Sequence, residues 1–320
     1  MIVWPFCRHQ SRATVEPEED PPPTGNAIVS LPVEKMRARR HPMALIGLWA
    51  WQAALALVVG APAAAMVGGT YGAHPQGEAA LWEPGGRVLL DFIWRNAPAF
   101  ATLRREAELL LVISAAAGLV PAAAAMYAMA HRRLDQRPAG FVPSVAGALA
   151  VLPSLGGVLV LFGVTQGLVL AAGTGAASLC AQKMLGRVGE ALAQQIAMAV
   201  GLAFLLICFV LAVLHDLTRA AIVRFGVNAG VGFSMGLRAF RRAPASLCWG
   251  WSWRTLSSLA PAVAVAAAPT PFRPTGASTL VLVLITHQIA TGTRVALRAS
   301  WLAKALRSVK PAPYSFLPGA

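Results

Sequence analysis

Long apolar stretches alternate along this chain with short segments rich in arginine and lysine. The stretches cover residues 43–67, 109–130, 141–173, 196–214, 245–268 and 279–303. About 20 apolar residues in helical conformation cross the hydrocarbon core of a bilayer, where every backbone polar group must be satisfied within the helix. Each stretch therefore predicts a transmembrane helix. The third stretch is too long for one upright span and contains Pro143 and Pro153, so we expect a kinked or interfacial entry followed by one span.

Basic clusters at alternate ends of these stretches set the expected orientation. They precede the first stretch at residues 35–40, follow the second at 131–133 and follow the fourth at 219–224. Cytoplasmic loops of membrane proteins carry an excess of lysine and arginine, so we expect these segments on the cytoplasmic side. The sequence thus predicts an all-α, polytopic transmembrane helical bundle of six spans with both termini inside (N-in/C-in).

The predicted six-span membrane domain covers residues 43–304 and lies between two tails. Residues 1–42 contain acidic and proline-rich runs without helical or strand periodicity. Such a composition buries too little apolar surface to offset the entropy of ordering, so we expect a disordered cytoplasmic tail. Residues 305–320 are expected to form a short cytoplasmic tail. We expect no cleaved leader, because the opening apolar run is short and is followed by basic residues.

Two connecting segments predict amphipathic helices that lie in the membrane interface. Residues 87–96 have an apolar face and are expected on the outer leaflet. The residues of that face are Val88, Leu89, Phe92 and Ile93. Residues 231–242 predict a basic helix on the cytoplasmic surface, with anionic lipid headgroups as its partner. Its apolar residues are Phe233, Leu237 and Phe240, and its arginines are Arg238, Arg241 and Arg242.

Composition and charge agree with a membrane protein. Hydrophobic residues make up 57% of the chain, charged residues 12%, and the mean hydropathy is +0.60, whereas about 25% of a soluble protein is charged. Loop lysines and arginines account for the net charge of +14, so we expect no nucleic-acid partner. The four cysteines are scattered and predict no metal, cofactor or structural disulfide. Arginine-rich and alanine-rich codon usage favours a bacterial origin and hence the bacterial inner membrane.

Charged side chains in the carboxyl-terminal spans are the candidate functional residues. Arg254, Arg294 and Arg298 are expected to meet Asp216 at one depth in the inner leaflet. Asp216 has Arg254, Arg294 or the nearby Arg219 as its possible partners. The remaining positive charge calls for lipid phosphate, backbone carbonyls or an anionic ligand. The alternative is that the arginines only anchor helix ends at the interface, with their charged heads reaching toward water.

The carboxyl-terminal part also carries a family resemblance. Its motifs are Asp216-Leu-Thr-Arg-Ala, then Leu237-Arg-Ala-Phe-Arg-Arg-Ala-Pro, and then Gln288 followed by Arg294, Arg298, Ala299 and Ser300. This part resembles a family of bacterial six-span inner-membrane proteins that has no known activity. The likeness extends loosely from about His41 to the end of the chain. It implies the six-span fold and lends no catalytic residues.

Two functional hypotheses follow. The first is an integral membrane protein without a catalytic site that acts as a scaffold or accessory component, with the bilayer and a protein partner or a second copy as its contacts. The second is a small permease or channel for an anionic or amphipathic solute, with the arginines lining its path. The mid-span His287 and Gln288 are expected to bond a neighbouring helix in either case.

Overall fold

The computed structural model describes residues 28–31, 36, 38, 41–71, 87–133, 139–267 and 277–311. These residues form ten helices and one two-stranded sheet, which confirms the all-α class. Four segments of the described chain are long and apolar enough to cross a membrane. They are Pro42–Pro62, Glu108–Ala130, Leu152–Val188 and Glu190–Phe225.

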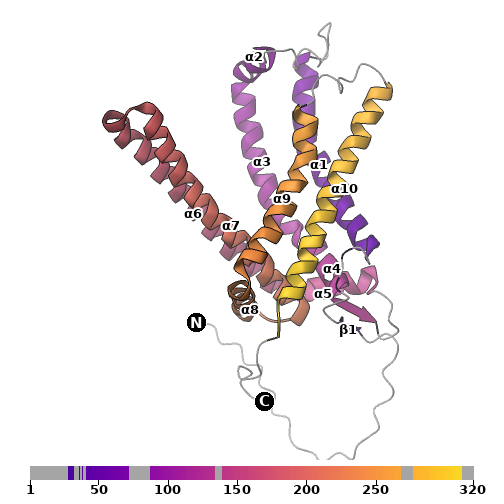
Figure 1. Cartoon of the computed structure of the whole chain (residues 1–320). Helices are drawn as coiled ribbons and strands as arrows, with labels where there is room; N and C mark the ends of the chain where they lie inside the picture. The colour runs from indigo at the N-terminus through magenta and orange to yellow at the C-terminus, as the bar shows by residue number, and fades with distance from the viewer. Residues whose placement is uncertain are drawn as a thin grey trace, which may run out of the picture.

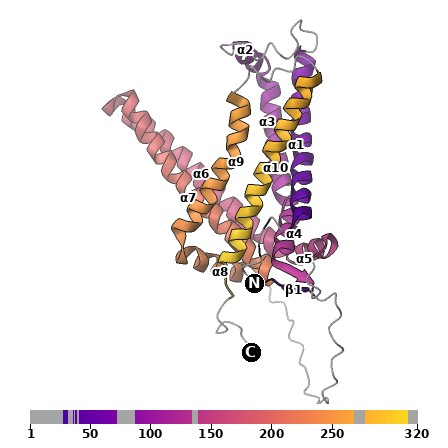
Figure 2. The same cartoon turned by 45° about the vertical axis from the view of Figure 1, so that its right-hand side comes forward.

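The long helices run between two ends of the molecule (Figure 1, Figure 2). They are α1 (Pro42–Tyr71), α3 (Ala97–Ala117) with α4 (Leu119–Ala130), α6 (Leu152–Val188), α7 (Glu190–Phe225), α9 (Pro244–Ala267) and α10 (Ala277–Ser308). The short helices α5 (Phe141–Ala150) and α8 (Ala229–Arg242) lie at the end where α1 begins and α10 stops. Helix α2 (Arg87–Arg95) lies at the opposite end. We call the end that holds α4, α5 and α8 the core end.

The main hydrophobic core lies at the core end, where the last turns of α7 and α10 meet α4, α6 and α8. Its fully buried side chains come from α4, α6, α7 and α10: Met126, Leu155, Leu217, Ile222, Trp301, Leu302 and Leu306. Arg224 at the end of α7 donates to the carbonyls of Leu306 and Val309, at 2.7 and 2.8 Å. A cation at the C-terminus of a helix interacts favourably with its unpaired carbonyls. Arg224 therefore fixes the end of α10 against α7.

Helices α6 and α7 form a hairpin that leans away from the other long helices (Figure 1, Figure 2). Gly189 is the single residue between them and has φ 83°, a left-handed value that favours glycine. The helices contain 37 and 36 residues, so the hairpin is about 55 Å long at 1.5 Å per residue. Large apolar side chains along its outer part are exposed, among them Leu161, Leu168, Met198, Leu202 and Leu206.

Several observed helix limits differ from the predicted spans, and one predicted break is present; α6, for example, continues to Val188, whereas the third stretch was predicted to end at residue 173. The fourth span, predicted to end at residue 214, continues as α7 to Phe225, because its last turns bury apolar side chains in the core. Helix α7 then ends at Gly226, whose φ of 64° allows the expected sharp turn. The second stretch is interrupted at Gly118 between α3 and α4. The third stretch breaks at Val151, as the prolines predict.

Both predicted tails are partly ordered. Strand β1 (Ile28–Ser30) pairs antiparallel with β2 (His131–Arg133), and Met36 is fully buried, so the predicted disorder of residues 1–42 does not hold for these residues. Residues 1–27 lie outside the described residues. At the other terminus, α10 continues to Ser308, and Ala305, Leu306 and Val309 are buried. The boundary predicted at residue 305 therefore cuts through the core.

The predicted helices at 87–96 and 231–242 are present as α2 and α8. In α8 the buried side, which approaches α7, consists of Gly232, Met235, Gly236 and Ala239, whereas Leu237 and Phe240 of the predicted apolar face are half-buried against the core and Phe233 is exposed. A Cβ added at Gly236 would lie 3.0 Å from the backbone nitrogen of Thr218, so glycine allows the two helices to approach closely. In α2, Phe92 is buried against Met66, Val88 and Phe100, whereas Ile93 is exposed. The side chain of Leu89 lies outside the described residues.

Candidate functional site

Asp216 is the centre of a polar cluster between α7 and α10. Its carboxylate accepts two hydrogen bonds of 2.6 Å from the two terminal nitrogens of Arg298, one to each oxygen. Trp301, one turn further along α10, donates its indole N–H to the same carboxylate at 2.8 Å. A forked pair of this kind is among the strongest polar contacts in proteins. The cluster therefore joins two long helices at one fixed register.

The predicted partners of Asp216 need correction. Arg254 and Arg294 make no ion pair with it among the described residues, and Arg219, one turn along α7, lies 4.0 Å from the carboxylate. Asp216 and Arg219 are buried, with 3% and 8% of their surface exposed. The Nε atom of Arg219 has no hydrogen-bond partner. The main neutralising contact thus comes from Arg298, and Arg219 adds positive charge that the single carboxylate does not fully offset.

Arg254 on α9 is held by polar groups other than carboxylates. Its Nε donates to the Ser300 hydroxyl at 3.1 Å, and one terminal nitrogen donates to the Gly250 carbonyl at 2.7 Å. The guanidinium also lies 4.6 Å from the centre of the Trp253 ring, a cation–π contact. These contacts orient Arg254 without cancelling its charge.

A cavity of about 250 Å³ lies between α1, α9 and α10 and brings the three predicted arginines together. We call it the arginine cavity. Its lining residues are Gln52, Trp251, Arg254, Thr255, Ser258, Leu259, Arg294, Arg298 and Trp301. No carboxylate is among them, so the walls offer mainly hydrogen-bond donors and positive charge. The clustering of Arg254, Arg294 and Arg298 expected from the sequence is therefore present in the structure.

The other predicted residues lie outside this cavity. Gln288 on α10 accepts a hydrogen bond of 3.1 Å from the indole of Trp49 on α1, as expected for a polar residue that bonds a neighbouring helix. His287 is exposed. On α8, Arg241 and Arg242 are exposed, which leaves these two available to an anionic surface, and Arg238 is half-buried.

Of the other residues of the site, Trp301 was not predicted, Ser300 was noted only within the resemblance motif, and Gln52 was expected only as one of several glutamines that could line a transport path. Trp301 and Ser300 follow Arg298 within one turn of α10, so the spacing from that arginine is the only indication that they share its surroundings. Gln52 reaches the cavity from α1, more than 200 residues away in the chain. Such a contact depends on how α1 packs against α10, which local periodicity does not specify.

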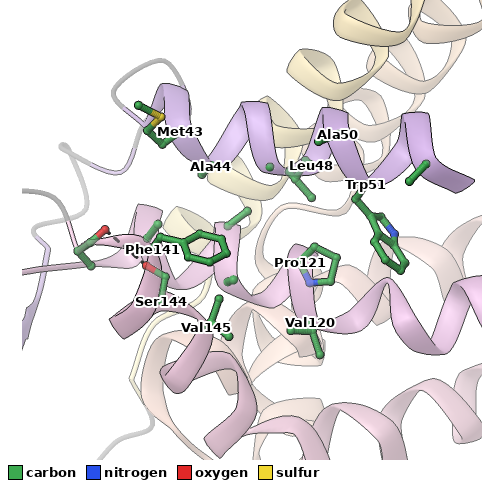
Figure 3. Close-up of a pocket in the computed structure, with 16 residues that line it drawn as sticks. Met43, Ala44, Leu48, Ala50, Trp51, Val120, Pro121, Phe141, Ser144 and Val145 are labelled. Carbon is green, nitrogen blue, oxygen red and sulfur yellow. Dashed lines mark hydrogen bonds between the residues drawn. The ribbon is translucent and has the colours of Figure 1, made fainter.

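A wider groove of about 520 Å³ lies between α1, α4 and α5 (Figure 3). Its walls are apolar side chains such as Met43, Trp51, Pro121 and Phe141. The hydroxyl of Ser144, which also lines it, donates to the Gly140 carbonyl at 2.8 Å, so its donor is already used. The groove therefore offers a hydrocarbon-like surface, in contrast to the arginine cavity.

The described residues contain no group of three or more histidine, cysteine, aspartate or glutamate side chains that could hold a metal ion. Comparison with protein-family models, with curated proteins and with solved structures finds no match for this chain. The functional argument therefore depends on the geometry of the chain itself.

Proposed function

We propose that this protein is a non-catalytic accessory component or scaffold of a membrane assembly, embedded in the bacterial inner membrane by six spans with both termini in the cytoplasm. Four helices long and apolar enough to cross a membrane support the membrane assignment. The alternating direction of the long helices, which brings the start of α1 and the end of α10 to one end, supports the even number of spans (Figure 1). Exposed arginines on α8 support contact with anionic lipid at that end.

The observation that carries the accessory role is the α6–α7 hairpin. Its outer part leans away from the other long helices (Figure 1). Large apolar side chains along that outer part are exposed. Helices in a membrane associate mainly by close packing, because lipid tails are as apolar as the side chains themselves. A hairpin that its own bundle leaves uncovered is therefore a suitable surface for a transmembrane helix of a partner protein.

A ridge of small residues on α6 indicates where such a helix would pack. Gly163, Gly167, Ala171 and Gly175 are spaced four residues apart and are all exposed. No atom lies within 4 Å of a Cβ built at any of the three glycines. Ridges of this kind allow two backbones to approach closely in membranes, and α8 already uses Gly232 and Gly236 in this way against α7.

Site-specific photo-crosslinking in cells tests this role. A photoreactive residue at the exposed Leu170, beside the ridge, is expected to give a discrete crosslinked protein band. Gly167→Leu should abolish that band because its side chain blocks close approach, whereas Gly186→Leu, equally open but near the tip of α6, should leave it unchanged. A band at twice the mass of the chain identifies a second copy as the partner. Lipid adducts alone, or a band that Gly167→Leu does not affect, would count against the accessory role.

The arginine cavity favours a second candidate, a small permease or channel for an anionic or amphipathic solute. Three guanidinium groups from two helices line it, and no carboxylate is among its described lining residues. Arg294→Ala is expected to abolish anion flux in liposomes if the cavity lies on a transport path. Flux equal to that of the unaltered protein would count against this candidate.

A further inference from the structure

The arginine cavity holds more positive charge than its surroundings neutralise. Asp216 offsets Arg298 by a forked ion pair. Arg254 contacts a hydroxyl, a carbonyl and the Trp253 ring, and no carboxylate among the described residues. Arg294 is exposed and forms no hydrogen bond or ion pair with the described part of the chain. Two guanidinium groups therefore face one cavity without a protein anion, an arrangement that repulsion disfavours unless another anion enters.

The donors around the cavity suit a tetrahedral oxyanion better than a planar one. A carboxylate has two oxygens in one plane and is satisfied by a single arginine fork, as Asp216 is by Arg298. Arg254 projects from α9 and Arg294 from α10, so their forks approach from different helices. A phosphate group has enough oxygens to accept from both arginines.

The cavity lies where a headgroup or a water-borne anion can reach it. Trp249 and Trp253 flank the lining residue Trp251 on α9 and are both exposed, and exposed tryptophans gather where a membrane meets water. Arg294 itself is exposed, so the cavity is open on that side.

We propose that the cavity between α1, α9 and α10 is a binding site for a phosphate group, carried either by an anionic lipid headgroup or by a soluble phosphate compound. Arg254 and Arg294 supply the charge and the hydrogen-bond donors. Arg298 stays paired with Asp216 and borders the site. This assignment holds whether or not the hairpin binds a partner and whether or not the chain transports a solute.

Two titrations of the intact protein in phosphatidylcholine nanodiscs test the site and separate the two sources of phosphate. The first adds inorganic phosphate and follows binding by calorimetry. The second adds phosphatidic acid to the nanodiscs and counts bound lipid by native mass spectrometry. Saturation in the first alone identifies a soluble ligand, and retention of lipid in the second alone identifies a headgroup.

Arg294→Gln is the informative variant, because this side chain makes no bond that the described fold needs. It should weaken binding about tenfold or more, since a charge-assisted hydrogen bond is worth about 1.5–3 kcal/mol. Arg254→Gln should do the same. Arg187→Gln removes an arginine from the far end of α6 and should bind like the unaltered protein. If neither ligand binds the unaltered protein more tightly than Arg294→Gln, or if Arg187→Gln loses binding equally, the proposed site is wrong.

Discussion

Replacement of Asp216 by asparagine removes the charge that holds α7 to α10. The asparagine keeps one oxygen acceptor but cannot receive both terminal nitrogens of Arg298, which now lie 2.6 Å from the carboxylate. It also turns the neighbourhood of the buried Arg219 wholly positive. We therefore expect the variant to fold less stably, with the loss confined to the packing between these two helices.

The expected loss of folding free energy follows from how far each member of the Asp216–Arg298 ion pair is buried. Breaking a buried ion pair by removing one member costs about 3–5 kcal/mol. The Arg298 side chain is 39% exposed and can turn toward the arginine cavity, so Asp216→Asn should cost about 3 kcal/mol, the lower end of that range. The Asp216 side chain is only 4% exposed, so Arg298→Gln, which strands the carboxylate, should cost about 4 kcal/mol.

Unfolding in mixed micelles of dodecyl maltoside and dodecyl sulfate, followed by tryptophan fluorescence, measures both variants and the double variant. The double variant should cost less than the two single changes together, by about 2 kcal/mol or more, because the pair is removed as a unit. Neutral hydrogen bonds between membrane helices average about 0.6 kcal/mol. If each single variant lost only about that much free energy of unfolding, and the two losses were additive in the double variant, the view that a buried charge pair fixes the register of α7 and α10 would be refuted.

Three further outcomes are expected. Gly236→Val should destabilise the fold by about 1–3 kcal/mol through overpacking against Thr218, measured by thermal unfolding, whereas Gly230→Val should cost less, because a Cβ there meets only Asn228 Oδ1, at an ordinary contact distance of 3.7 Å. Arg224→Ala should speed amide hydrogen exchange in residues 306–311, because it frees the carbonyls of Leu306 and Val309. Burial lowers the pKa of His131 from 6.5, so the stability of the β1–β2 pair should be full above pH 6.5 and decline as pH falls through the lowered pKa; the protection factors of residues 28–31, which correct hydrogen exchange for its intrinsic pH dependence, should then be lower at pH 5 than at pH 7.5.

Hydrophobic periodicity and charge predicted the elements whose signals are local. Runs of apolar residues, and the helix-breaking residues between them, predict the long helices, the break in the third stretch and the helices α2 and α8. The clustering of Arg254, Arg294 and Arg298 was also predictable, since arginines in apolar helices gather where polar partners and water are available.

The sequence predicted a common depth for Asp216 and Arg298, but not that Arg298 is the arginine that pairs with the carboxylate. Asp216 lies nine residues before the end of α7 at Phe225, and Arg298 lies ten residues before the end of α10 at Ser308, so the two share one depth. Which arginine faces the carboxylate depends on how α7, continued beyond residue 214, packs against α10. The continuation of α7 depends on burial of its last turns against α4, α8 and α10, a tertiary effect that helix propensity does not encode.

The face of α8 that contacts α7 was not predicted, for a related reason. Amphipathic patterns give weight to large apolar residues such as Phe233, yet the close approach of α8 to α7 needs the absence of side chains at Gly232 and Gly236. Hydropathy treats glycine as nearly neutral and so does not detect it as a contact residue. The strand pairing between residues 28–30 and 131–133 was missed because it joins segments that are about 100 residues apart.

The one-residue connection at Gly189 has a consequence for the biosynthesis of the chain. Because only one residue separates α6 from α7, one helix cannot take its final position in the bilayer while the other remains outside. On the proposed topology, the two helices enter the membrane together as a pair whose polar tip, with Arg187 and Glu190, crosses in a single event. Insertion of α7, and not of α6 alone, then fixes the topology of this part of the nascent chain.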